Sequence, residues 1–145
     1  MLFSKEYVDY VTKTANQKYT VEMAACALME EMIEFDNVVI EDDMIDELGD
    51  VYYQFILFAY LTGANLETIE YDDSLRDSMQ CILAITSQFK KRTTRGKELN
   101  YNDIDKYLSF VYSDIVEMTQ QANLDIKSVE QYNMKKLNER YGVNV

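Results

Sequence analysis

The sequence almost lacks the residues that interrupt helices. It has no proline and only four glycines among 145 residues. In a helix interior proline costs about 3 kcal/mol and glycine about 1 kcal/mol relative to alanine, so their scarcity favours helices over hairpins and turns. A chain of this length forms one ordinary domain that buries roughly 68 to 70% of its unfolded surface. We therefore expect residues 1–145 to form a single all-α domain, a bundle of about six helices.

Caps and breakers give approximate helix boundaries. Thr20 and either Asp72 or Asp73 are suitable N-caps, and Gly63 is a plausible left-handed C-cap. The predicted helices cover residues 4–16, 21–36, 41–62, 74–92, 103–121 and 125–141, with Gly96 in a loop.

The helices show signs of a degenerate tandem duplication, with repeats at 1–72 and 73–141. Three apolar positions of the third helix recur at a constant offset in the fifth, where the neighbouring acids are replaced by aromatic residues. The recurring positions are Leu48, Val51 and Tyr52, which match Leu108, Val111 and Tyr112. Chance similarity between amphipathic helices is the alternative explanation.

Four carboxylates form the most specific local pattern. Glu31 and Glu34 are followed, after twelve residues, by Glu47 and Asp50. The i,i+3 spacing places both members of each pair on one helical face, so two adjacent helices can direct four oxygen ligands at one point. Such a cluster needs a cation to offset its repulsion. Oxygen ligands alone point to Mg²⁺, with Mn²⁺ as a possibility.

Charge is divided unevenly along the chain. The net charge of −12 argues against nucleic-acid binding. The segment Lys90 to Lys97 nevertheless holds five basic residues and no acid. These runs indicate a cation site and an anion site, unless both are simply solvated faces. No apolar run is long enough to span a membrane, and two cysteines without a signal-like amino terminus suggest reduced thiols in the cytoplasm.

The acidic pattern, written EExxE, a twelve-residue spacer and ELGD, resembles that of the MazG-like all-α nucleoside triphosphate pyrophosphohydrolases, the superfamily that includes dimeric dUTPases and dCTP pyrophosphatases. Lys90 to Leu99 is similar to the basic loop of that family. Asn133, Lys136 and Leu137, followed by Arg140 and Tyr141, resemble its closing NxxKL and RY pattern. The match departs from simple members because the acids lie in the first half and the basic loop in the second. The second half either completes the site or serves only as a scaffold.

The resemblance implies Mg²⁺-dependent cleavage of a nucleoside or deoxynucleoside triphosphate to the monophosphate and pyrophosphate. Glu30 lies within about 40° of Glu34 on the helix and is the candidate to orient or deprotonate water, although it could equally be a solvated carboxylate. Pyrophosphate needs cationic or amide donors. The candidate phosphate ligands are Lys91, Arg95, Lys97, Asn133, Lys136 and Arg140.

Base recognition is less clear from the sequence. Gln54 is the only amide in an apolar run and lies one turn beyond Asp50, so it is either a base contact or a buried glutamine bonded to a neighbouring helix. Asn16 and Gln17 are weaker candidates. We expect a homodimer. The alternative function is a non-catalytic acidic helical module that binds a nucleotide or a protein partner.

Overall fold

A computed structural model describes residues 3–15, 18–74 and 76–142. Within these ranges the chain forms helices and no strand, which confirms the all-α prediction. Two 3-10 turns, Glu41–Asp43 (η1) and Leu66–Thr68 (η2), accompany six α-helices. The α-helices are α1 (Lys5–Thr14), α2 (Val21–Asp36), α3 (Met44–Leu61), α4 (Ser78–Arg95), α5 (Tyr101–Gln121) and α6 (Ile126–Tyr141). None of the described helices is both long and apolar enough to cross a membrane.

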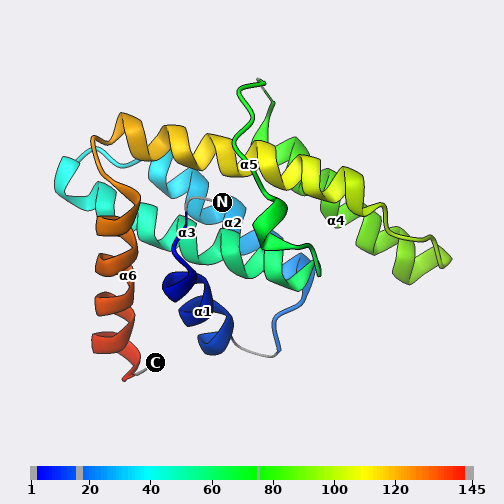
Figure 1. The fold of residues 1–145 in the computed structure, drawn as a ribbon, viewed down its shortest axis with the longest axis horizontal. Helices are drawn as coiled ribbons and strands as arrows, with labels where there is room; N and C mark the ends of the chain where they lie inside the picture. Colours follow the sequence, from blue (N-terminus) through cyan, green and yellow to red (C-terminus); the bar gives the residue numbers. More distant parts are fainter. Residues whose placement is uncertain (1–2, 16–17, 75, 143–145) are drawn as a thin grey trace.

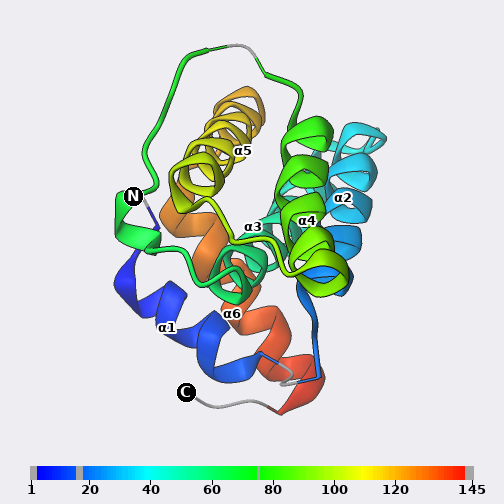
Figure 2. The same ribbon diagram turned by 90° about the vertical axis from the view of Figure 1, so that its right-hand side faces the viewer.

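Helix α3 is the centre of the bundle. It packs against α1, α2, α5 and α6, as Figures 1 and 2 show. Its continuous apolar run explains this position, because the five residues from Phe55 to Ala59 are all buried. A helix that is apolar around most of its circumference needs neighbours on several sides. These four helices therefore surround α3, α4 packs on α2 and α5, and all share one hydrophobic core.

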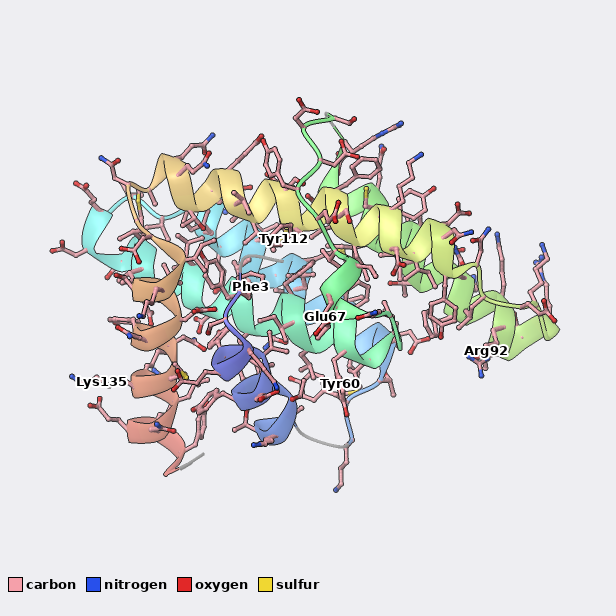
Figure 3. All side chains as sticks on the ribbon, in the orientation of Figure 1. Phe3, Tyr60, Glu67, Arg92, Tyr112 and Lys135 are labelled. Atoms are coloured by element: carbon pink, nitrogen blue, oxygen red, sulfur yellow. The ribbon has the colours of Figure 1, made fainter. Side chains whose placement is uncertain are left out.

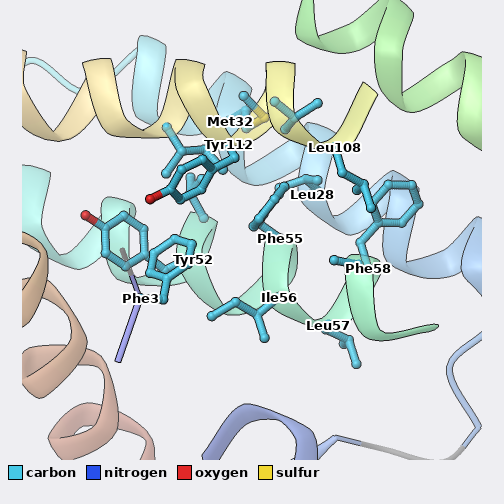
Figure 4. Packing of buried hydrophobic residues seen from close by; sticks show 14 of the residues in the cluster. Phe3, Leu28, Met32, Tyr52, Phe55, Ile56, Leu57, Phe58, Leu108 and Tyr112 are labelled. Carbon is cyan, nitrogen blue, oxygen red and sulfur yellow. The ribbon is translucent and has the colours of Figure 1, made fainter. Parts of the chain in front are cut away.

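Aromatic side chains fill one end of this core. Phe3 precedes α1 and lies with its ring centroid 4.8 Å from that of Tyr52 and 5.6 Å from that of Tyr112, both in edge-on geometry (Figure 4). The hydroxyls of Tyr52 and Thr119 are 2.6 Å apart, so the buried Tyr52 oxygen has a polar partner. These contacts join the start of the chain to α3 and α5.

The helix boundaries differ from the prediction mainly around α4. The helix begins at Ser78, not at residue 74, because Asp77 caps the backbone N–H groups of Met79 and Gln80. Residues 70–72 lie along α5 instead, where the N–H groups of Glu70 and Asp72 donate to serine hydroxyls of that helix. These tertiary hydrogen bonds compete with continuation of a helix.

Smaller corrections affect the other helices. Helix α1 ends at Thr14 and not at residue 16, and the first turn of the predicted third helix is the separate 3-10 turn η1. Asn100 caps α5, which therefore starts two residues earlier than predicted. Gly63 has a positive φ of 78° beyond α3, in agreement with the predicted left-handed residue.

The duplication stays a prediction. The three apolar positions that suggested it are buried in both α3 and α5. The turns after these helices are less alike, since η2 is a single 3-10 turn where α6 is a full helix.

Candidate functional site

Three of the four predicted carboxylates meet at one end of the bundle. Glu31 and Glu34 lie on α2, and Glu47 lies on the neighbouring α3. One carboxylate oxygen from each lies within 4.8 Å of the others. Oxygen ligands of an octahedral Mg²⁺ are separated by about 3 to 4 Å, since each metal-oxygen distance is about 2.1 Å. Small side-chain movements therefore suffice to bring these three oxygens onto one ion, and we call Glu31, Glu34 and Glu47 the glutamate triad.

The electrostatics of the triad call for a cation. In the absence of a metal ion, burial and then the charges of Asp50, Glu34 and Glu47 raise the pKa of Glu31 to about 8. Burial, followed by the charges of Asp50 and Glu34, also raises the pKa of Glu47. One buried oxygen of Glu31 and one of Glu47 have no hydrogen-bond partner. Unpaired buried carboxylate oxygens are costly, and a divalent ion would satisfy them.

Asp50 is placed differently from the prediction. Its Oδ1 accepts from the Lys136 ammonium at 2.8 Å, and it does not belong to the triad. The same ammonium is 2.7 Å from Oδ1 of Asp46, which the sequence reasoning missed. Asp46 lies four residues before Asp50 on α3, so its i,i+4 spacing was the signal that could have found it. We call Asp46, Asp50 and Lys136 the aspartate-lysine bridge.

The position of Lys136 corrects a second prediction. It was expected to bind phosphate, whereas its side chain is only 14% exposed and contacts two carboxylates. Burial opposes its charge, but the hydrogen bonds and charges of the two aspartates outweigh this and raise the pKa of Lys136. In this structure Lys136 is therefore paired with the chain's own carboxylates.

Close packing of α3 and α6 fixes this arrangement. Gly49 faces Asn133, and a Cβ on Gly49 would lie 3.0 Å from both Cβ and Nδ2 of Asn133. Only glycine permits this approach without movement. Asn133 is fully buried, and its Oδ1 accepts from the Tyr7 hydroxyl at 2.8 Å. Asn133 packs the helix interface, but its Nδ2 has no hydrogen-bond partner and the residue borders the cavity described next, so its role as a phosphate ligand stays a prediction.

A cavity of about 550 Å³ adjoins the triad between α1, α2, α3 and α6. Glu31, Asp50 and Arg140 supply its charged groups. Aromatic rings contribute much of the remaining wall, from Tyr10, Tyr19, Tyr53 and Tyr141. The volume lies within the range of small-molecule sites, which are commonly about 300 to 1,000 Å³. The cavity thus combines carboxylates with flat apolar surfaces.

Gln54 lies in this cavity wall, as its position one turn beyond Asp50 predicted. Its Oε1 is buried and has no hydrogen-bond partner, so the described structure does not supply the helix-helix bond that was the alternative explanation. Arg140 also reaches the cavity. Asn16 and Gln17, the weaker candidates for base contacts, lie outside the described residues.

The tyrosines that the sequence did not single out supply acceptors as well as flat surfaces. Thr14 donates its hydroxyl proton to the carbonyl of Tyr10 at 2.8 Å, so the Tyr53 hydroxyl, 3.0 Å away, donates to Thr14. The Tyr10 hydroxyl donates to Oδ1 of Asn138 at 3.0 Å. Both phenolic oxygens keep lone pairs free to accept from a ligand.

The basic segment lies elsewhere. Lys91, Arg95 and Lys97 are exposed at the end of α4, and none of them borders the cavity. Figures 1 and 3 show that this end of α4, near Arg92, and helix α6, near Lys135, are at opposite ends of the long axis. The segment is also helical up to Arg95 and is not a loop. Of the two alternatives left open for the second half, the structure gives no support within one chain to completion of the acidic site by this basic segment.

Glu30 is not brought to the cavity either. It is exposed on α2 and belongs neither to the triad nor to the cavity lining. Its role in activating water has no geometric support within one chain, and the solvated carboxylate is the simpler interpretation.

Comparisons with models of protein families, with curated proteins and with solved structures find no match to this chain. The resemblance to the MazG-like enzymes thus stays a prediction from the motifs, and the site has to be judged on its own geometry.

Proposed function

We propose that the protein is a Mg²⁺-dependent nucleoside triphosphate pyrophosphohydrolase, which converts a nucleoside or deoxynucleoside triphosphate to the monophosphate and pyrophosphate. The observation that carries the proposal is the glutamate triad at the edge of a tyrosine-lined cavity of about 550 Å³. Metal ligands beside flat apolar walls suit a ligand with a polyphosphate at one end and an aromatic base at the other.

The carboxylates would hold the reacting end of the substrate. A divalent ion, Mg²⁺ or Mn²⁺, would polarise the phosphate oxygens and lower the pKa of an attacking water. Glu31, Glu34 and Glu47 would bind that ion, since their oxygens already converge within 4.8 Å. Hydrolysis adds water to the α-phosphorus, breaks its bond to the oxygen bridging to the β-phosphorus, and releases one proton. Glu30, the predicted base, would have to move toward the cavity to accept it.

The tyrosine-lined wall of the cavity would hold the nucleoside. Gln54 borders the cavity and its Oε1 is buried without a partner, so a rotation of the side chain would let it accept a hydrogen bond from the base. Tyr53 and Tyr19 border the same cavity, and their rings would stack on the base. Arg140, which borders the same cavity, would bind the polyphosphate.

Further anion-binding groups would come from a second copy of the chain. We propose a homodimer in which Lys91, Arg95 and Lys97 of one copy approach the acidic end of the other. This arrangement is supported by charge alone: ten acids lie between Glu30 and Asp50 and five cations between Lys90 and Lys97. It would supply the phosphate ligands that the chain's own cavity lacks.

The experiment is a substrate panel with product identification. The purified chain would be incubated with Mg²⁺ and each common ribo- and deoxyribonucleoside triphosphate, and chromatography would measure monophosphate and pyrophosphate. We expect at least one substrate to be cleaved, and Glu34→Gln and Glu47→Gln to lose at least a hundredfold in kcat. Glu22→Gln, an exposed change in the first turn of α2, is the matched control.

Two outcomes separate the proposal from its rival. Turnover that depends on the triad but not on Glu22 supports the enzyme. Absence of turnover across the panel, with nucleotide still bound in calorimetry, would instead favour the non-catalytic acidic module.

A further inference from the structure

The aspartate-lysine bridge places a protein cation inside an acidic cluster. The Lys136 ammonium lies 2.7 Å from Asp46 and 2.8 Å from Asp50, and its side chain is 14% exposed. Distances this short are typical of charge-assisted hydrogen bonds. Asp50 lies one helical turn after Glu47 of the triad on α3, and it borders the same cavity as Glu31. The bridge and the triad are therefore neighbouring parts of one charged cluster.

The backbone packing holds Lys136 in this position. Lys136 lies one helical turn after Asn133, whose side chain is pressed against Gly49 of α3. Tyr7 of α1 anchors the same Asn133 through its hydroxyl. The ammonium thus extends from a helix whose distance from α3 is fixed at the preceding turn. Pre-organisation of this kind lowers the entropic cost that makes exposed ion pairs weak.

Five carboxylates in one cluster could in principle hold two divalent ions, which in two-metal sites lie about 3.5 to 4 Å apart. Here Glu31, Glu34 and Glu47 converge on one another, while Asp46 and Asp50 converge on Lys136. The cluster is divided into one group of ligands without a protein cation and one group that already has a cation.

We propose that Lys136 is a resident cation that occupies the second cation position of the acidic cluster, so that each chain binds a single divalent ion at the glutamate triad. This inference rests on the proposed metal site and deepens it by setting the number of ions. Lys136 is a positioning residue, because it would neutralise Asp46 and Asp50 without contacting the metal ion itself. Removing its charge would free two aspartates and create a second divalent site beside the first.

The test is the number of ions bound to the full-length chain without nucleotide. Mn²⁺ binding would be counted by calorimetry and by the loss of the free-ion signal in electron paramagnetic resonance. We expect one ion per chain for the unmodified protein and two for Lys136→Met, which keeps an unbranched side chain one atom shorter and removes its charge. Lys136→Arg should retain one ion. Lys135→Met is the matched control, since Lys135 is the exposed neighbour on α6 and should leave the count at one.

A second variant keeps the test decisive if Lys136→Met folds poorly. Lys136→Gln removes the charge but keeps an amide that can hydrogen bond to Asp46 or Asp50, and it too should bind two ions, whereas a count of one would overturn the inference. Circular dichroism would check helicity for each variant.

The outcomes are distinguishable. One ion in both the unmodified protein and Lys136→Met would overturn the resident-cation inference while leaving the metal site intact, and two ions in the unmodified protein would overturn it as well. If the unmodified protein binds no Mn²⁺, the metal site of the proposed function fails and the inference falls with it. A change in KM for the triphosphate with an unchanged ion count would show Lys136 to be a phosphate ligand instead.

Discussion

The first prediction concerns Glu31, whose carboxylate lowers the stability of the metal-free protein at alkaline pH but would bind the metal ion. Replacing Glu31 by Gln removes a carboxylate that is partly buried beside Glu34, Glu47 and Asp50. In chelator, the substitution should stabilise the protein at alkaline pH and have little effect near pH 5. In Mg²⁺, the same substitution should remove the stabilisation that the metal provides.

The sign follows from the pKa of Glu31. Without a cation that pKa rises from the ordinary 4.5 to about 8, so the folded state holds a proton that the unfolded chain releases earlier. The associated stability is fully present below pH 4.5 and is lost as the pH rises through about 8. The complete difference corresponds to at most about 5 kcal/mol, at about 1.4 kcal/mol per tenfold change. Because water reaches this half-open site, we expect screening to reduce it to about 1–2 kcal/mol.

The assay is thermal unfolding followed by circular dichroism from pH 5 to pH 9, first in chelator and then in Mg²⁺. An effect of this size corresponds to about 3–8 °C in Tm for a chain of this length. The Tm of the unmodified protein should fall relative to that of Glu31→Gln as the pH rises, and Mg²⁺ should restore it. Glu30→Gln, an exposed change of the same charge on the next residue, should follow the unmodified protein. Parallel curves for Glu31→Gln and the unmodified protein would refute the reasoning.

Three further predictions follow from the site. Gly49→Ala should lower the free energy of unfolding, measured in urea, by about 0–2 kcal/mol. Overpacking against Asn133 costs about 1–3 kcal/mol, and alanine regains up to about 1 kcal/mol of helix propensity. A higher free energy of unfolding would contradict this. Gln54→Leu should change the ratio of kcat/KM between bases at least tenfold with Mg²⁺ affinity unchanged, and a uniform loss would show that Gln54 reads no base. Lys91→Ala should preserve Mg²⁺ affinity and lower kcat/KM for the triphosphate through the partner copy, whereas unchanged kinetics would leave the basic segment as a solvated surface.

Local spacing predicted the parts of the site that depend on one helix. The i,i+3 positions of Glu31 and Glu34 follow from helix geometry alone, and so does the location of Gln54 one turn beyond Asp50. The adjacency of α2 and α3 follows from their short connection. These rules predict that the triad converges and that Gln54 follows Asp50 in the cavity wall.

Prediction was weaker wherever the direction of a helix had to be known. The similarity of the acidic and basic segments to one family suggested that they meet, but the end of α4 that holds Lys91 and Arg95 projects away from α6, as Arg92 shows in Figure 3. The start of α4 depends on the hydrogen bonds of the preceding segment to α5, which no local pattern reveals. Complementary charge therefore indicates which segments could pair, but it does not show whether the fold brings them together.

Lys136 shows the same limit in a single side chain. Its position three residues after Asn133 separates it from the exposed Lys135, but the sequence gives no indication of whether its ammonium meets a phosphate or the chain's own carboxylates. The choice is made by the tertiary contact of Gly49 with Asn133, which brings α6 close enough for one lysine to reach Asp46 and Asp50 and leaves its neighbour exposed. An acidic motif can thus be identified from spacing, but the cations available to it depend on how closely the next helix approaches. The number of metal ions that such a motif binds is consequently a property of the helix packing as much as of the carboxylates.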